Sequence, residues 1–431
     1  MSNSPPTYEE IVRRVGAPVV AIVFGVGQYQ GLAVLRALGR MGVPVYAVGE
    51  EKSVGFHSRY ARTPLVSPDP HHDPEGLLNL LLSVGRRLKA RGERAVLFPT
   101  RDSVVELIAK QQDALAEFFI CHTPRADVIR NCASKEAQIR TARALAVPTP
   151  RTYFDNELEL LYQDLSGGRS NYPLLFKPKR ELPPEQLKAF RLITLSNERQ
   201  LKEAVARAKQ HDVPFLIQEI IPGADDTLYS LGSCLSKDGK MKAIFTGRKL
   251  RQRPPRFGEC RVGESIYVEP IMRDGERLLR GLGFFGISQV EFKFDARDGQ
   301  YKLLEVNPRS WSWISLPVAM GINIPFAFFC DACGIEIPTQ TMTSQRVVYI
   351  SLRDDLYWSL KGRDGVPWIH CFRGYEKIVE PFFSLDDPMP GLIYFKRAGM
   401  EFLGGLGRAF LRKLGLARRT SGQFAHDVTG N

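Results

Sequence analysis

The 431-residue chain is poor in the residues that build many hydrolytic and metal sites. It has only seven histidines and seven cysteines, and no serine–histidine–aspartate or cysteine–histidine arrangement is evident. Cys330 and Cys333 form a lone CxxC motif without a second pair or nearby histidines, so we assign them to a helix core instead of metal or redox chemistry. The odd, scattered cysteines favour a reducing compartment.

Long apolar runs are also missing. No stretch reaches the length of a membrane span, and the N-terminal sequence does not have the pattern of a secretory leader. We therefore expect a cytoplasmic protein. The hydrophobic fraction of 44% and the charged fraction of 25% exclude a disordered chain, and the length suits about two to four domains.

Positive charge is what the chain has in excess. Its net charge of +12 favours an anionic substrate, a nucleotide or a membrane surface. Because no nucleic-acid reader motif accompanies this charge, we predict no nucleic-acid partner. Residues 392–419 are amphipathic and basic, so they either lie on an acidic membrane, with the protein membrane-associated, or pack as an ordinary helix. We favour the packed helix.

The first residues show the pattern of a small α/β domain. Residues 19–24 form a continuous apolar run, typical of a buried parallel strand, and residues 43–48 form the next strand. The glycines at 25, 27 and 31 lie between the two, with the spacing GxGxxxG. This resembles a dinucleotide-binding fingerprint only weakly, so we favour a tight packing turn and keep a nicotinamide-dependent oxidoreductase as an alternative.

Residues 286–309 are the most informative stretch, because their alternation predicts a β-hairpin. Val290, Phe292 and Phe294 alternate with polar residues, and Leu304 and Val306 alternate with their neighbours in the same way. The turn between the strands ends in a glycine, which tolerates positive φ. A loop of residues 297–299 would place residues 291 and 305 opposite each other.

Glu291 and Glu305 would then have Cβ atoms about 4.5–5.5 Å apart. Two carboxylates this close repel each other unless a cation lies between them. Asn307 lies on the same face as Glu305 and adds a neutral oxygen. This set suits Mg²⁺, with Mn²⁺ as a substitute, because Mg²⁺ shares its other positions with waters and phosphates. The alternative is two solvated glutamates on an exposed face, which the spacing alone favours.

Other segments carry further candidate residues at the ends of elements. Ser134 can cap a helix that begins at Lys135, and Lys177 lies at the end of a short apolar strand. The basic run 246–256, which contains Lys249, is either a lid over an anionic ligand or a solvated face. A further strand and turn include Gln218, Glu219, Ile220, Ile221, Asp225 and Asp226.

The order of these motifs resembles the ATP-grasp superfamily, and most closely its carboxylate–amine ligase branch. That branch includes D-aspartate ligase-like proteins and relatives of the large subunit of carbamoyl-phosphate synthase. The resemblance covers about residues 20–335. It implies a mixed α/β and α+β chain: a Rossmann-like pre-ATP-grasp domain (1–130), an ATP-grasp domain of two subdomains with the nucleotide between them (131–335), and a C-terminal extension (336–431).

The resemblance also implies roles for the candidate residues. Lys135 and Lys177 would touch the α- and β-phosphates of ATP, and Arg309 would stabilise the transferring phosphoryl group, with Lys249 as a second catalytic candidate. Segment 218–221 would read the adenine, and Asp225 or Asp226 would bind the ribose. The Mg²⁺ ligands would be Glu291, Glu305 and Asn307.

One segment departs from the family pattern. Many relatives have a glycine-rich loop after the second lysine, whose backbone amides cover the phosphates. Residues 178–192 contain no glycine, and Lys179, Arg180 and Arg191 could supply charge in its place.

The reaction implied by the resemblance is ATP-dependent ligation of a carboxylate to an amine. Transfer of the γ-phosphoryl group to the carboxylate gives an acyl phosphate, which the amine attacks, releasing phosphate after ADP. The partners would be small-molecule substrates, and we consider a homodimer. The alternatives are carboxylation, with bicarbonate as the activated acid, and a non-catalytic nucleotide-binding protein.

Overall fold

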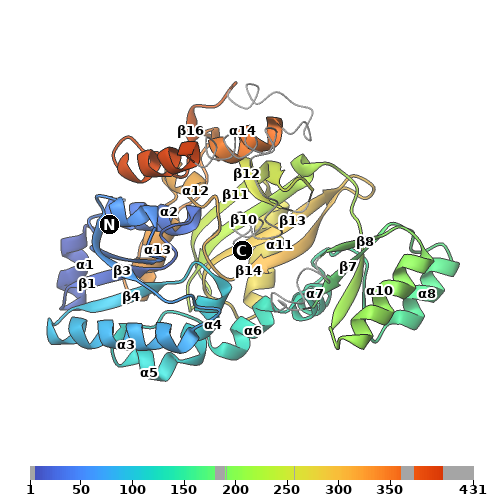
Figure 1. Ribbon diagram of the computed structural model, residues 1–431, viewed down its shortest axis with the longest axis horizontal. Helices are drawn as coiled ribbons and strands as arrows, with labels where there is room; N and C mark the ends of the chain where they lie inside the picture. The colour runs from blue at the N-terminus through green and yellow to red at the C-terminus, as the bar shows by residue number, and fades with distance from the viewer. Residues whose placement is uncertain (1–4, 180–189, 191, 257, 361–372, 401–431) are drawn as a thin grey trace, which may run out of the picture.

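The computed structural model describes residues 5–179, 190, 192–256, 258–360 and 373–400. The strands in these residues form sheets of five, four and seven strands. Figure 1 shows the seven-stranded sheet in the middle of the molecule, with the N-terminal domain on one side and the four-stranded lobe on the other. The mixed α/β and α+β class predicted from the sequence is confirmed.

The N-terminal domain is a parallel sheet with helices on both faces. Its elements are α1 (Tyr8–Val15), β1 (Val19–Val23), α2 (Tyr29–Gly39), β2 (Val45–Gly49), η1 (Val54–His57), β3 (Ala61–Val66), α3 (Pro74–Ala90), β4 (Arg94–Phe98), α4 (Asp102–Lys110), α5 (Gln112–Ala116) and β5 (Phe119–Ile120). The strand order is β3-β2-β1-β4-β5. Strands β1 and β2 are buried along their whole length, because apolar side chains on both faces meet helices. This is the Rossmann-like arrangement that the sequence predicted.

The glycine-rich turn after β1 brings α2 close to the sheet. Gly25 has a φ of +64°, and a Cβ atom on Gly31 would lie 2.2 Å from the carbonyl oxygen of Gly25. No larger residue fits at position 31 without moving backbone. The packing role that we favoured for these glycines is therefore present in the structure.

The four-stranded lobe is antiparallel. It follows α6 (Ala126–Ala133) and α7 (Lys135–Ala144) and consists of β6 (Thr152–Phe154), α8 (Leu158–Ser166), β7 (Leu174–Pro178), β8 (Ile193–Leu195), α10 (Glu198–Gln210) and β9 (Phe215–Glu219). The strand order is β6-β9-β7-β8. Helices α8 and α10 cover one face with an apolar core of their own. Residues 220–227, which include η2 (Asp225–Thr227), then lead from β9 into the large sheet.

The large sheet continues beyond the residues expected to form the ATP-grasp domain. Its strands are β10 (Leu228–Leu235), β11 (Met241–Arg253), β12 (Glu259–Ser265), β13 (Gly286–Asp295), β14 (Gln300–Asn307), β15 (Val347–Ile350) and β16 (Lys377–Val379), in the order β14-β13-β10-β11-β12-β15-β16. Two short strands of the C-terminal extension, β15 and β16, thus extend this sheet. Helix α11 (Glu269–Gly281) packs on one of its faces.

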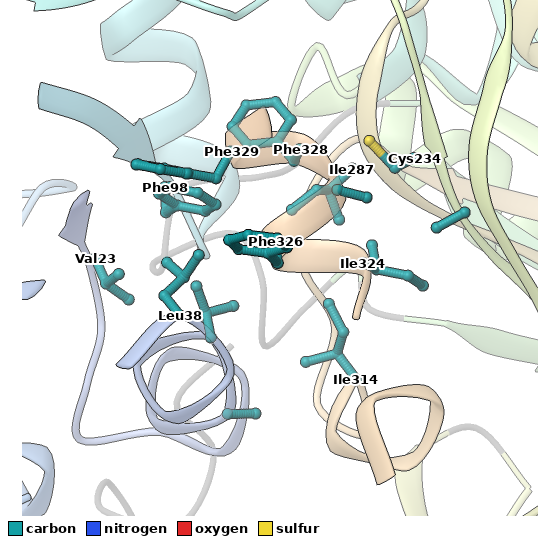
Figure 2. Close-up of a cluster of buried hydrophobic side chains, with 14 of the residues drawn as sticks. Val23, Leu38, Phe98, Cys234, Ile287, Ile314, Ile324, Phe326, Phe328 and Phe329 are labelled. Atoms are coloured by element: carbon teal, nitrogen blue, oxygen red, sulfur yellow. The ribbon is translucent and has the colours of Figure 1, made fainter. Parts of the chain in front are cut away.

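A shared core joins the N-terminal domain to the large sheet. Figure 2 shows Phe326, Phe328 and Phe329 between side chains of the N-terminal sheet, such as Phe98, and side chains of the large sheet, such as Ile287. This aromatic cluster is core. It follows a break between two helices, α12 (Ser315–Ala319) and α13 (Ile324–Ala332), where Gly321 has a φ of +86°.

The last described residues fold back onto the N-terminal domain. After α14 (Leu352–Leu360), residues 381–387 form a strap over α2, where Arg36 donates to Asp387 Oδ2 at 2.9 Å and to the carbonyls of Pro381, Phe382 and Asp387. A helix then covers residues 389–400. Within the described ranges, no helix is long and apolar enough to cross a membrane. Most of the predicted amphipathic segment 392–419 lies outside them.

Candidate active site

Glu291 of β13 and Glu305 of β14 lie opposite each other in the sheet, as the sequence predicted. The loop that we assumed does not explain this pairing. The loop has four residues, 296–299, since Asp295 pairs with Gln300. A regular ladder from that pair would put Leu304 opposite Glu291. A bulge after Glu291 shifts the register by one residue and brings Glu305 into place.

The bulge also changes which side chains are buried. We expected Leu304 and Val306 to share the buried face, but Leu303 and Val306 are buried and Leu304 is only half-buried. At the loop end, Asp295 is fully buried where we expected a polar, outward position. Lys302 and Arg297 each contact its carboxylate at 2.6 Å and hold the pKa of Asp295 well below its usual range.

Lys249 of β11 reaches Glu291 across β10. Its Nζ lies 2.8 Å from the Glu291 carboxylate, and the lysine is 4% exposed. Burial raises the pKa of the Glu291 carboxyl; Lys249 opposes this shift, and the charge of Glu305 adds to it. Glu291 is thus a carboxylate whose charge the site only partly compensates.

The basic run that contains Lys249 is not a solvated face, and that interpretation was wrong; its role toward an anionic ligand stays a prediction. Most of it belongs to β11, and its side chains make ion pairs within the fold. Arg248 pairs with Glu264, Arg251 with Asp355 at 3.1 Å, and Arg253 with Glu259 at 2.8 Å. The cationic side chains of β11 therefore form ion pairs with carboxylates of other elements. The number of charges along the sequence does not reveal these partners.

Arg309, which follows β14, forms a bidentate ion pair with Asp102. Its Nε and Nη2 donate to the two carboxylate oxygens at 2.9 and 2.8 Å. Asp102 begins α4, at the carboxyl end of β4 in the N-terminal domain. The charge of Arg309 also acts on Glu291 and Glu305. Sequence reasoning missed Asp102; its place directly after a parallel strand was the available signal.

Lys177 lies near the end of β7, close enough to Glu305 for the two charges to act on each other. Burial lowers the pKa of Lys177 to about 8; Glu305 raises it, and Lys135 lowers it further. The Nζ of Lys177 donates to Gln218 Oε1 at 2.7 Å, and Gln218 Nε2 donates to Thr152 at 2.9 Å. The lysine is therefore held in position by a neutral partner.

Lys135 begins α7, and Ser134 caps the helix by accepting from the backbone N–H of residue 137, as predicted. Lys179, which we counted as a substitute for the missing glycine-rich loop, is used elsewhere. Its Nζ contacts Glu136 at 2.6 Å and Asp155 at 2.8 Å. Arg180 and Arg191, the other two substitutes, lie outside the described residues.

The segment predicted to read adenine connects the lobe to the large sheet. Gln218 and Glu219 end β9, and Ile220 and Ile221 follow, the latter buried. The Glu219 carboxylate accepts from the backbone N–H of Arg151 at 2.8 Å and from Arg297 at 3.0 Å. Of the four residues, Gln218 is the one in contact with Lys177.

Asp225 and Asp226 differ in what they contact. Asp225 accepts from the backbone and side-chain nitrogens of Gln252 at 3.0 and 2.9 Å and from the backbone N–H of Arg256 at 3.1 Å. It thus fastens η2 to the end of β11. Asp226 is exposed.

The carboxylate pair fits a divalent cation that brings other ligands with it. Asn307 lies beside the pair, and its amide nitrogen donates to Glu305 at 3.2 Å, so ligation through the amide oxygen requires the amide to turn over. Nowhere in the described part of the chain do three or more His, Cys, Asp or Glu side chains form a group that could hold a metal ion. A metal at Glu291 and Glu305 would therefore need oxygens from outside the protein, and phosphates supply them.

Comparisons with solved structures identify the fold of the chain. No family model matches the chain. In solved structures, it is similar to N5-carboxyaminoimidazole synthetase from Staphylococcus aureus (TM-score 0.59, 12% identity, 85% of this chain and 89% of that one). It is also similar to the biotin carboxylase domain dimer of Hydrogenobacter thermophilus 2-oxoglutarate carboxylase, solved with MgADP, ADP and bicarbonate (TM-score 0.56, 16% identity, 77% and 74%). The chain has the ATP-grasp fold.

The chain also resembles one curated protein in sequence. The chain is 23% identical over 268 residues to D-aspartate ligase of Enterococcus faecium (strain Aus0004). The match covers 60% of this chain and 63% of that enzyme, which is less than two thirds of its length. The resemblance to the carboxylate–amine ligase branch, stated from the motifs, is thus supported by sequence as well as by fold.

Proposed function

We propose that the chain is an ATP- and Mg²⁺-dependent ligase that joins a carboxylate to an amine. One observation carries the proposal: the fold brings Lys177, Glu291, Glu305 and Arg309 into one charged cluster, although they come from three separate strands and a following loop. Lys249 pairs with Glu291 inside it. Such a cluster supplies the positioning and charge neutralisation that phosphoryl transfer needs.

A carboxylate is a poor electrophile because its negative charge repels nucleophiles, and phosphorylation removes that obstacle. Lys177, with Lys135 nearby, would hold the phosphates that precede the transferred group, and Gln218 keeps Lys177 aimed. Bound Mg²⁺ would neutralise phosphate charge from its place on Glu291 and Glu305, with Asn307 as a third ligand. Arg309 would stabilise the charge on the transferring group, with Lys249 as a second cation.

The proposal also covers the alternative metal, the nucleotide contacts, the substrates and the oligomeric state. Mn²⁺ would replace Mg²⁺, because it accepts the same oxygen ligands. The adenine would lie against residues 218–221 and the ribose at Asp226, with Asp225 the less exposed alternative. The substrates would be small molecules in the cytoplasm, and the active protein a homodimer. D-aspartate is the first carboxylate to test, because it names the curated relative.

Carboxylation is a second candidate. The similarity to a biotin carboxylase domain solved with bicarbonate favours it. In that case bicarbonate would be the acid that is phosphorylated, and the same cluster would serve the transfer. The two candidates differ in the acid that stimulates ADP release.

ADP release tests both candidates. We would measure it with D-aspartate, L-aspartate, other amino acids and bicarbonate, each with a panel of amines and with ammonium. Stimulation by an amino acid together with an amine supports the ligase, whereas stimulation by bicarbonate supports the carboxylase. Tight ATP binding without stimulated release by any pair would leave a non-catalytic nucleotide-binding protein. NADH binding without ATP binding would contradict the proposal.

A further inference from the structure

The carboxyl ends of the N-terminal strands carry a cation that the proposed mechanism does not use. The strand order β3-β2-β1-β4-β5 means that the chain first runs outward from β1 to β2 and β3, and then returns to the other side of β1 with β4. In open α/β sheets, ligands bind outside the carboxyl ends of the strands at this point of reversal. A ligand of the N-terminal domain is therefore expected at the loops after β1 and β4.

Polar contacts hold these two loops together. The Oγ1 of Thr100, after β4, donates to the carbonyl of Phe24, after β1, at 3.0 Å. Gln30 Nε2 donates to Gln28 Oε1 at 2.9 Å, and Arg101 Nε donates to the same oxygen at 3.4 Å. Arg101 thus extends from the loop after β4 to the loop after β1, across the point of reversal.

The next residue in the chain connects this place to the candidate active site. Asp102 forms the bidentate ion pair with Arg309. Figure 1 shows α4, which begins at Asp102, at the border between the N-terminal domain and the large sheet. Arg101 is therefore the direct chain neighbour of the residue that fixes Arg309.

Arg101 differs from Arg309 in how well its charge is compensated. Arg309 has two short bonds to one carboxylate, whereas the ion pair of Arg101 with Glu50 is 3.3 Å long and the Glu50 side chain is 73% exposed. A solvated carboxylate of this kind holds a guanidinium weakly. The partner Gln28 is neutral, and the charges of Arg101 and Asp69 also attract each other. An incoming anion can therefore replace Glu50 at Arg101 at little cost.

We propose that Arg101 binds an anionic group of the acid substrate, other than the carboxylate that is phosphorylated. The substrate would then be an acid with a second carboxylate or a phosphate, because the planar fork of arginine donates two parallel hydrogen bonds to either group. One carboxylate would lie beside Arg309, and the second anion would lie at Arg101 in place of Glu50. This inference rests on the proposed ligase function and specifies the class of its acid.

The test compares acids with and without a second anionic group. We would measure ADP release by the full chain with ATP, Mg²⁺, a panel of amines and one acid at a time. D- and L-aspartate carry a second carboxylate, O-phosphoserine carries a phosphate, and alanine carries neither. We expect aspartate or O-phosphoserine to act at concentrations at least about tenfold below those that alanine requires, since a hydrogen bond to a charged group is gained. The more effective of the two identifies the second anion.

Two variants of Arg101 measure its contribution. Arg101→Gln should raise the KM for the more effective acid at least about tenfold, while kcat and the KM for ATP change less than about twofold. Arg101→Lys keeps the charge but loses the fork, so its KM should lie between those of the parent and Arg101→Gln. The matched control is Arg62→Gln, because Arg62 also has a 3.3 Å ion pair, with Glu93, but at the amino ends of the same strands. This control should change none of the three constants.

The outcomes separate this inference from the ligase proposal. An Arg101→Gln variant with the parent KM, or alanine as effective as the other acids, overturns the inference and leaves the ligase standing. A fall in kcat without a rise in KM also overturns it, because Arg101 would then act only by positioning Asp102. Thermal melting confirms that each variant is folded.

A chain in which no acid stimulates ADP release would contradict the ligase proposal, and direct binding then decides the inference. The measurement is calorimetric titration of aspartate and O-phosphoserine into the chain with Mg²⁺ and ADP. Binding that Arg101→Gln weakens and Arg62→Gln preserves supports the site. Absence of binding by either acid overturns it.

Discussion

Two charge clusters in this molecule differ in how their charges are compensated. At the strap over the N-terminal domain, the partly exposed pair of Asp386 and Arg40 is bound by hydrogen bonds that hold the pKa of Asp386 below its usual range and that of Arg40 above it, while burial lowers the pKa of Arg36 behind them. In the candidate active site, the pKa of Glu291 is raised and that of Lys177 is lowered, both toward the neutral form. The Asp386–Arg40 pair is compensated within the protein, whereas we expect Glu291 and Lys177 to be stabilised when a ligand adds charge.

The difference arises from the partners. Asp387 of the strap accepts from Arg36, from Ser58 and from the backbone N–H of Arg59, so its charge is surrounded by donors. Glu291 has one lysine and faces a second carboxylate. Lys177 donates its hydrogen bond to a neutral amide oxygen, while the charges of Glu305 and Lys135 act on it in opposite directions. Incomplete compensation of this kind is typical of functional sites.

The largest expected effect is loss of turnover when the carboxylate pair is broken. Glu305→Ala should lower turnover by about a thousandfold or more, because the metal loses a ligand while the phosphates still need neutralising. The fold should be retained, since Glu305 is only half-buried. Steady-state ADP release and a thermal melt measure the two properties. Near parental turnover in this variant would remove the hairpin from the mechanism.

Breaking the strap should lower the stability of the protein. Asp387→Ala leaves Arg36 buried without its carboxylate, and we expect the free energy of unfolding to fall by about 3–5 kcal/mol. The matched control is Asp386→Ala, whose side chain is 39% exposed, and its effect should stay below about 1 kcal/mol. Denaturant titration measures both. Equal losses in the two variants would contradict the role of burial.

Asp102 should affect turnover more than binding. Asp102→Asn keeps the shape but loses the charge that fixes Arg309, so we expect kcat to fall by about a hundredfold with little change in KM for ATP. A parallel variant, Asp113→Asn, alters an acidic residue of the neighbouring α5 and should change neither constant. If KM for ATP rises while kcat holds, Arg309 binds the nucleotide's ground state instead of the transferring group.

Lys177→Ala should weaken ATP binding by about 1–3 kcal/mol, the value of a lost charged hydrogen bond. Its thermal stability should change little, because burial already disfavours the charged form in the free protein. Lys135→Ala should weaken binding less, since a helix terminus is more solvated. Calorimetric titration with a non-hydrolysable ATP analogue decides. Unchanged affinity in both variants would place the phosphates elsewhere.

The smallest effect is a pH dependence of that affinity. The pKa of Lys177 is lowered from 10.5 to about 8 in the free protein, and a bound phosphate would favour the protonated form. Affinity for the analogue should therefore fall as the pH rises through about 8, with protons taken up on binding just above that pH. Titrations at several pH values in two buffers of different ionisation enthalpy would detect the uptake. The Lys177→Ala variant should show no such fall.

Local patterns predicted much of the fold. The apolar runs of the N-terminal strands, the Ser134 cap and the alternation in β13 each depend on neighbours in the sequence, and each element forms where it was expected. The pairing of Glu291 with Glu305 was right although the loop was one residue longer than assumed, because a bulge compensates. A bulge shifts the register by one residue, and the sequence gives little indication of where it occurs.

Contacts between distant segments were not predictable in this way. Arg309 and Asp102 are 207 positions apart, and nothing in either neighbourhood indicates the other. The ion pairs of β11 and the addition of β15 and β16 to the large sheet depend on which strands become neighbours, which is a property of the whole chain. The roles of the candidate residues toward ATP and Mg²⁺ remain predictions.

The strap also sets the order in which the protein can be completed during synthesis. The N-terminal domain leaves the ribosome before the strap does, because Arg36 on α2 precedes residues 381–387 in the chain. The partners of that arginine are the carbonyls at 381 and 382 and the carboxylate of Asp387. Until those residues emerge, Arg36 remains exposed to water on a partly bare surface. A nascent chain that stops short of residue 381 would therefore carry an N-terminal domain whose Arg36 lacks its carbonyl and carboxylate partners in the strap.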